Sequence, residues 1–91
     1  MKEEHHIYLK GKVQGVFLRS SAKRIAKHLN LYGWIQNLDN GDVEICVQGS
    51  LEEAQAFIRE LQKEPKPKIF IIEISSRPLE TTYTSFAIVE K

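Results

Sequence analysis

The sequence is poor in the residues that build disulfides, metal clusters and membrane spans. Its single cysteine, Cys46, excludes an internal disulfide and a cysteine-based zinc site, and this composition fits an intracellular, reducing compartment. No run approaches the roughly 18 apolar residues of a membrane span. The charged segment Met1–His6 lacks the apolar stretch of a signal peptide. We therefore expect a cytoplasmic protein.

Neither sign of charge dominates. Thirteen basic and twelve acidic side chains are scattered along the chain and leave a formal charge of +1. Nucleic-acid binders use a broad electropositive field, which this pattern does not supply. With 42% hydrophobic and 27% charged residues, 91 residues have room for one core. We expect a single domain over residues 1–91, a monomer, with no nucleic-acid partner and no membrane partner.

Hydrophobic periodicity predicts alternating strands and helices. Apolar and polar residues alternate from His6 to Lys12, as in a half-buried strand, whereas apolar residues recur at helical spacing from Leu18 to Asn30. The remaining elements follow in order: strands over 32–38 and 42–48, a helix opened by the capping box Ser50-Leu51-Glu52-Glu53, a strand over 69–75 and a short strand around Phe86 and Ile88. The order is typical of an α+β, ferredoxin-like βαββαβ sandwich: a mixed sheet, two helices on one face, and here an extra short C-terminal strand.

Three local signals predict how the chain reverses. Asn30 tolerates the left-handed backbone that often closes a helix. Asn40-Gly41 supplies the positive backbone angles of a tight hairpin turn. Pro65 and Pro67 end the second helix and form a stiff loop that carries lysines.

The segment between the first strand and the first helix has the features of an anion site. In the predicted topology the first two strands run parallel with the third between them, so this segment and Asn37 lie about two strand spacings, ~9.5 Å, apart. A helix start presents unpaired N–H groups and a positive dipole end. Gly15 lets the backbone curl, and Arg19 adds a planar fork for phosphate oxygens. The residues alone also allow a plainer interpretation, in which Gly15 serves a turn and Arg19 lies at the surface.

Two motifs carry a family resemblance. The phrase Gly11-Lys12-Val13-Gln14-Gly15-Val16-Phe17-Leu18-Arg19 resembles the V-Q-G-V-x-F-R signature of acylphosphatases. The phrase Leu29-Asn30-Leu31-Tyr32-Gly33-Trp34-Ile35-Gln36-Asn37 resembles the G-W-V-x-N motif of the same family. The resemblance covers nearly the whole chain. Leu18 stands where the family usually has Phe, Asn30 where it often has Gly, and residues 63–68 depart from the usual loop.

The resemblance implies an enzyme that hydrolyses acyl phosphates to a carboxylate and inorganic phosphate, with no metal and no cofactor. It implies that Arg19 and Asn37 are the catalytic residues, Arg19 binding the phosphate and Asn37 orienting the attacking water, and that neither is a covalent nucleophile. The phosphate-binding residues would be Gln14, Gly15, Val16, Phe17, Leu18 and Arg19. The substrate is a small acyl phosphate, and we expect broad specificity for its acyl group.

Other polar and aromatic residues have plainer interpretations. Ser20 and Ser21 have no neighbouring His or acid to activate them and suit a helix start. His5 and His6 are adjacent on a strand, so their side chains point to opposite faces; we expect solvated or edge positions rather than one metal site. Three more residues are interpreted as structural: His28 as a helix-dipole partner, Cys46 as a packing residue and Trp34 as a packed aromatic.

Different functions stay open for this fold. The chain could be a noncatalytic phosphate- or metabolite-binding ferredoxin-like module, or an RNA-binding domain. RNA binding requires exposed aromatic residues on two central strands. Tyr8 is a candidate, but residues 42–48 offer only Glu44, Cys46 and Gln48 on the corresponding face. A role in carbamoyl phosphate handling, as in larger maturation proteins that contain such domains, is a further alternative.

Overall fold

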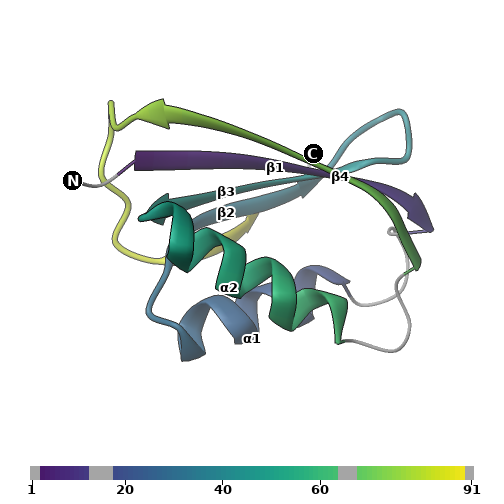
Figure 1. The fold of residues 1–91 in the computed structure, drawn as a ribbon, viewed down its shortest axis with the longest axis horizontal. Helices are drawn as coiled ribbons and strands as arrows, with labels where there is room; N and C mark the ends of the chain where they lie inside the picture. The colour runs from purple at the N-terminus through teal and green to yellow at the C-terminus, as the bar shows by residue number, and fades with distance from the viewer. Residues whose placement is uncertain (1–2, 13–17, 64–67, 90–91) are drawn as a thin grey trace.

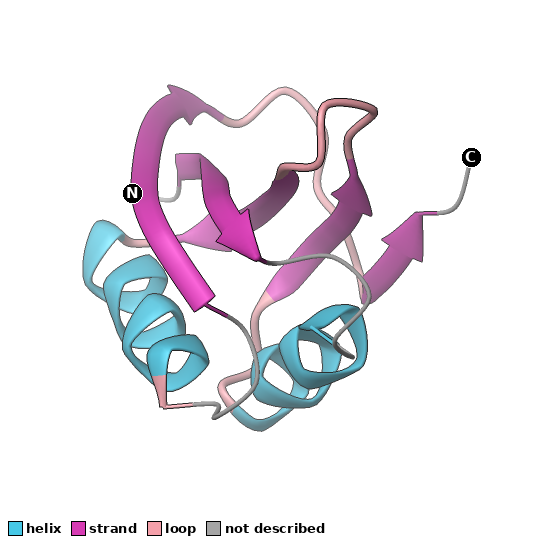
Figure 2. Ribbon diagram, turned by 90° about the vertical axis from the view of Figure 1, so that its right-hand side faces the viewer, coloured by secondary structure: helices cyan, strands magenta, loops and turns pink. Residues whose placement is uncertain are grey.

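The structure is a computed structural model that describes residues 3–12, 18–63 and 68–89. The elements are, in chain order, β1 Glu3–Lys12, α1 Leu18–His28, β2 Tyr32–Asn37, β3 Val43–Gly49, α2 Leu51–Gln62, β4 Lys68–Pro78 and β5 Phe86–Val89. The strands form one sheet in the order β4-β1-β3-β2-β5. Both helices cover the same face of this sheet (Figure 2). The predicted ferredoxin-like α+β fold with an added C-terminal strand is confirmed.

The topology places the C-terminal ends of the parallel strands β1 and β2 at the same end of the molecule. β3 pairs antiparallel with both β1 and β2, so β1 and β2 run parallel on either side of it. β5 adds to the sheet as a parallel partner of β2. The C-terminal ends of β1 and β2 and the N-terminal end of α1 consequently lie at the same, right-hand end in Figure 1.

The core lies between the sheet and the helices, and the predicted faces form it. Alternate residues of the central strands point inward, and the helices contribute residues at helical spacing: Ile7, Leu9, Val43, Ile45, Val47, Leu18, Ala22, Ile25, Ala26, Ala54, Phe57, Ile58 and Leu61. Each large side chain buried in this way contributes about 1.5–3 kcal/mol relative to an exposed position. The core therefore holds the start of α1 and the end of β2 in fixed relation to the sheet.

Two helix signals are confirmed, and one turn signal is corrected. Asn30 has a φ of 57° just after α1, and Ser50 and Glu53 form the capping box of α2. In the hairpin, however, only Gly41 has a positive φ, 94°, whereas Asn40 does not. The Asn40 side chain accepts a hydrogen bond from the Asp42 N–H at 3.0 Å instead. The loop is therefore a three-residue type, in which only the last position requires a left-handed backbone.

The strands at the β1–β4 side of the sheet are longer than the sequence indicated. β1 begins at Glu3 rather than His6, and β4 spans Lys68–Pro78 rather than residues 69–75. The two strands pair along this whole length, from Glu3 opposite Pro78 to Lys12 opposite Lys68. β1 pairs with β3 on one side and with β4 on the other. The polar residues Glu3, Glu4 and His5, which precede the alternating pattern, therefore also adopt strand conformation. The predicted proline loop, with Pro65 and Pro67, lies outside the described residues.

The face of the sheet opposite the helices is partly covered by the chain itself. Residues 79–85 run from the β4 edge of the sheet to the β5 edge and contact side chains of the strands between them. Gln48 accepts a hydrogen bond from the Tyr83 N–H at 2.9 Å, and its amide donates to the Thr81 carbonyl. The Trp34 indole donates to the Tyr83 hydroxyl at 3.2 Å. We call this side of the sheet the open face, because α1 and α2 both pack on the other side (Figure 2).

Candidate active site

The two predicted catalytic residues come from the ends of two elements that share one end of the fold. Asn37 is the last residue of β2, where it pairs with Val43 of β3, and its side chain is half-buried. Arg19 lies in the first turn of α1 and is also half-buried. Both elements are anchored in the core, β2 through Ile35 and α1 through Leu18. The fold thus brings both residues to the end of the sheet where the sequence predicted the site.

The start of α1 is suited to an anion by what its first turn contains. No acidic residue occurs there, whereas the last turn carries Lys27 and His28. The basic residues of the last turn compensate the negative end of the helix dipole, and no carboxylate of the first turn compensates the positive end. The Arg19 guanidinium adds a fixed positive charge at the same position. The described part of the site is therefore electropositive in a chain with almost no net charge.

The predicted phosphate-binding segment is described only in part. Gln14, Gly15, Val16 and Phe17 lie outside the described residues. Leu18 is the first residue of α1, and only 2% of its surface is exposed because its side chain packs in the core. Its side chain therefore anchors the helix, and any contact that Leu18 makes with a phosphate has to come from its main chain.

Gly33, which directly precedes Trp34, occupies a position where any side chain would collide with the neighbouring strand. Its φ is 151°, and a Cβ placed on it would lie 1.8 Å from the carbonyl oxygen of Cys46 on β3. Only a residue without a side chain allows β2 and β3 to approach so closely. This contact supports the pairing that carries Asn37 to the end of β2.

The histidines correct the interpretation from sequence. His5 and His6 do point to opposite faces, but neither is solvated, since their exposed fractions are 0% and 6%. His5 hydrogen-bonds through its two ring nitrogens to the Ser76 hydroxyl at 2.8 Å and the Gly49 carbonyl at 3.0 Å. Hydrogen bonds of this kind offset the cost of burying a polar ring. Burial is possible because β4 runs alongside β1 as far as Pro78, which places Ser76 opposite His5.

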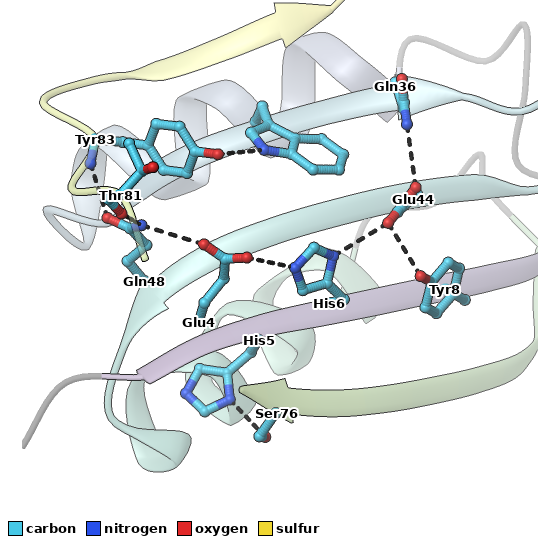
Figure 3. Close-up of polar contacts among 11 residues, drawn as sticks. Glu4, His5, His6, Tyr8, Gln36, Glu44, Gln48, Ser76, Thr81 and Tyr83 are labelled. Carbon is cyan, nitrogen blue, oxygen red and sulfur yellow. Dashed lines mark hydrogen bonds and ion pairs between the residues drawn. The ribbon is translucent and has the colours of Figure 1, made fainter. Parts of the chain in front are cut away.

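His6 is the centre of a polar cluster on the open face, shown in Figure 3. Its Nε2 is hydrogen-bonded to a Glu4 oxygen at 2.6 Å and its Nδ1 to a Glu44 oxygen at 3.1 Å. Glu44 also accepts hydrogen bonds from the Tyr8 hydroxyl and the Gln36 amide, each at 3.0 Å. Among the described residues no buried side-chain nitrogen or oxygen lacks a partner. The cluster is thus internally satisfied.

The cluster changes the acidity of its members. Burial by itself raises the pKa of Glu4, but hydrogen bonds from His6 and Gln48 outweigh burial and lower this pKa below its ordinary 4.5. For Glu44, hydrogen bonds from His6, Gln36 and Tyr8 likewise outweigh burial and lower the pKa. Burial, together with the neighbouring Glu4 charge, raises the pKa of Cys46 to about 12. The thiol is therefore protonated at neutral pH, as expected of a packing residue.

Sequence reasoning missed this cluster, although a signal for it was present. Glu4, His6 and Tyr8 alternate along the first strand, and Glu44, Cys46 and Gln48 alternate along the third. Neighbouring strands with matched alternation place both sets on the same face of a sheet. The register confirms it, with His6 opposite Cys46 and Tyr8 opposite Glu44.

Known proteins resemble this chain along nearly its whole length. The family model described as Acylphosphatase matches residues 5–88. An acylphosphatase of Pseudomonas paraeruginosa is 37% identical over 76 residues, which cover 82% of this chain and 84% of that protein.

No helix in the described part of the chain is long and apolar enough to cross a membrane.

Solved structures agree with this comparison. The acylphosphatase of Bacillus subtilis superposes with a TM-score of 0.89 and 29% identity, over 97% of this chain and 99% of that one. The HypF protein of T. kodakarensis superposes with a TM-score of 0.83 and 35% identity, but this chain covers only 12% of that longer protein. By sequence and by fold, this chain belongs to the acylphosphatase family.

Proposed function

We propose that this chain is an acylphosphatase that hydrolyses acyl phosphates at the end of the sheet where α1 begins and β2 ends. Family membership supports the reaction. One observation supports the location: the first turn of α1 carries Arg19 and no acidic residue, at the same end of the sheet as Asn37. A phosphate at this position meets a positive charge and a positive dipole end.

Arg19 binds the phosphoryl group in this proposal. Its guanidinium presents parallel N–H groups that match two phosphate oxygens, and charge-assisted hydrogen bonds of this kind contribute ~1.5–3 kcal/mol each. The main-chain N–H groups of residues 14–18 complete the phosphate site. Charge that builds on the phosphoryl oxygens in the transition state is stabilised by the same donors, so Arg19 contributes to rate as well as to binding.

Asn37 positions the attacking water. Its side-chain oxygen accepts a hydrogen bond from the water and its amide nitrogen can donate one, so the water is held without a strong base. The water oxygen bonds to phosphorus as the bond from phosphorus to the acyl oxygen breaks. The carboxylate leaves with that electron pair, and the proton of the water passes to the phosphate. An acyl phosphate has a good leaving group, so positioning and charge stabilisation suffice.

The same proposal covers the setting in which the enzyme works. It acts as a monomer in the cytoplasm, without a cofactor or a catalytic metal, on small acyl phosphates whose acyl group lies largely in solvent. Broad acyl specificity follows, because a group in solvent makes few discriminating contacts.

The test is hydrolysis of benzoyl phosphate by the purified chain in the presence of a strong metal chelator. Asn37→Ala should lower turnover about 100-fold while the melting temperature stays close to that of the wild type. Asn40→Ala is the matched control, because Asn40 lies in an exposed turn, where its side chain is hydrogen-bonded to Asp42. Near wild-type turnover of Asn37→Ala would remove Asn37 from the mechanism. Phosphate binding with no turnover by the wild-type chain would favour the noncatalytic phosphate-binding module.

A further inference from the structure

Three kinds of metal-binding side chain meet on the open face of the sheet. One donor atom each of Glu4, His6 and Cys46 lies within 4.8 Å of the others. The site is enclosed, since the exposed fractions of His6 and Cys46 are 6% and 0%. We propose that this cluster binds a divalent cation of the zinc class through a Glu4 oxygen, the His6 Nε2 and the Cys46 sulfur, separately from the proposed active site.

The donor set has the composition that zinc prefers. Zinc binds thiolate sulfur at about 2.3 Å and imidazole nitrogen or carboxylate oxygen at about 2.0–2.2 Å, in tetrahedral sites. Tetrahedral geometry at these lengths separates the donor atoms by roughly 3.3–3.8 Å. The contact between His6 Nε2 and Glu4 is 2.6 Å and has to open, and no pair has to close from beyond 4.8 Å. A single cysteine cannot form a zinc site of cysteines, but the fold supplies the other donors.

The imidazole is already oriented as a zinc ligand would be. Glu44 is hydrogen-bonded to His6 Nδ1 at 3.1 Å, and this contact leaves Nε2 facing Glu4 (Figure 3). Glu44 is in turn held by Tyr8 and Gln36. Carboxylates that hold the second nitrogen of a ligating histidine fix the ring and strengthen its binding to the metal. The contacts of Glu44 are a second observation, separate from the three donor atoms, and they favour the same kind of ion.

The backbone places the ligands without a flexible loop. His6 of β1 lies directly opposite Cys46 of β3, and Glu4 precedes His6 by two residues on the same face of β1. Both strands are interior to the sheet. The site therefore needs little reorganisation, and an ion held there joins two central strands. An ion that binds only the folded chain stabilises it by an amount that grows with the logarithm of the free ion concentration once this exceeds the dissociation constant.

The local charge also suits a dication. Wherever the shared protons reside, an ion placed between His6 Nε2 and Glu4 displaces one proton there and a second from the thiol, because metals bind thiolate and neutral imidazole. Two protons leave as a dication enters, so the charge of the cluster does not change. The titratable groups that face it from neighbouring strands and from the crossing segment are Tyr8, Glu44, Arg77 and Tyr83.

The first experiment is a titration of the chelator-treated protein with Co²⁺, followed by absorbance and fluorescence. One equivalent should produce a thiolate-to-cobalt charge-transfer band, and the band can come only from Cys46, the single cysteine. The same equivalent should quench Trp34, the single tryptophan, whose ring lies 5.8 Å from that of His6. A wild-type protein that shows no such band overturns the proposal, whatever its turnover of benzoyl phosphate.

Variants then separate this site from surface binding. Cys46→Ala should abolish the charge-transfer band, and Glu44→Gln should weaken Zn²⁺ binding about 10-fold or more. His28→Gln is the matched control, since His28 is exposed at the end of α1 and should leave Zn²⁺ binding unchanged. Zn²⁺ binding that survives Cys46→Ala and Glu44→Gln at full strength, or that is lost in His28→Gln, would contradict the assignment.

Discussion

The two helices lie on the same face of the sheet but begin in opposite ways. α2 has Ser50 as its N-cap and Glu52 and Glu53 in its first turn. The capping box supplies hydrogen-bond partners for N–H groups at the helix start, and the two carboxylates compensate the positive end of the helix dipole. α1 begins at Leu18 and Arg19 and has no acidic residue in its first turn. The comparison contrasts a helix start that serves stability with one at which we propose that an anion binds. The following changes test it.

The largest effect should come from removing the positive charge at the start of α1. Arg19→Ala should lower the turnover of benzoyl phosphate about 100-fold or more, because the phosphoryl charge then lacks its strongest partner. Steady-state kinetics measures the effect, and Arg24→Ala, on the exposed side of the same helix, is the control. A melting temperature that falls together with activity would indicate a structural role for Arg19 instead.

A smaller effect should follow when α1 is made to begin as α2 does. Ser20 is exposed in the first turn of α1, so Ser20→Glu adds a carboxylate without displacing core atoms. We expect KM for benzoyl phosphate to rise roughly tenfold through repulsion between the carboxylate and the phosphate, while the helix becomes slightly more stable. Ser20→Gln has the same size without the charge and should behave as the wild type. An equal KM for the two variants would show that no phosphate binds near this turn.

The reverse change at α2 should affect stability alone. Ser50→Ala removes the hydroxyl that accepts from the Glu53 N–H at 3.1 Å. The free energy of unfolding should fall by about 1 kcal/mol, as for other N-cap serines. This corresponds to roughly 4–8 °C in melting temperature for a domain of this size. Turnover at 25 °C should not change; a loss of turnover would mean that the start of α2 also contributes to the site.

The smallest effect we expect is acid destabilisation through the carboxylates of the open face, which lie on the side of the sheet opposite both helices (Figure 2). The pKa values of Glu4 and Glu44 are lowered from 4.5, so the unfolded chain binds more protons than the folded chain as the pH falls below that value. Their contribution is complete above about pH 5 and is lost as the pH falls through the folded values. It is small because burial opposes the hydrogen bonds at both groups.

Thermal unfolding in chelator between about pH 6 and pH 3 measures this contribution. The variant with both Glu4→Gln and Glu44→Gln should be less stable at the upper pH and should show a shallower decline. An equally steep decline in the double variant would assign acid destabilisation to other carboxylates.

Local rules predicted much of the fold from particular residues. Ser50 and Glu53 marked the start of α2, Asn30 marked the end of α1, and alternation assigned Val43, Ile45 and Val47 to the core. These features depend on neighbours within about one helical turn or one strand. Asn40 was assigned a wrong backbone angle because a two-residue and a three-residue hairpin loop share the Asn-Gly pair.

For the candidate site, the sequence predicted its place but not its detail. Asn37 does end β2 and Arg19 does lie in the first turn of α1. The roles of both residues stay predictions, as does the contribution of Gln14–Phe17, which lie outside the described residues. The resemblance to acylphosphatases is confirmed by the family model.

The sequence by itself determined the order of the elements, the faces that they bury and the family, because periodicity, caps and motifs act over short separations. Only the tertiary structure decided the environment of His5 and His6. Their burial requires β4 and β3 on either side of β1 and the crossing of residues 79–85 over the open face. Contacts between residues separated by up to 71 positions create that environment, and no local pattern records them.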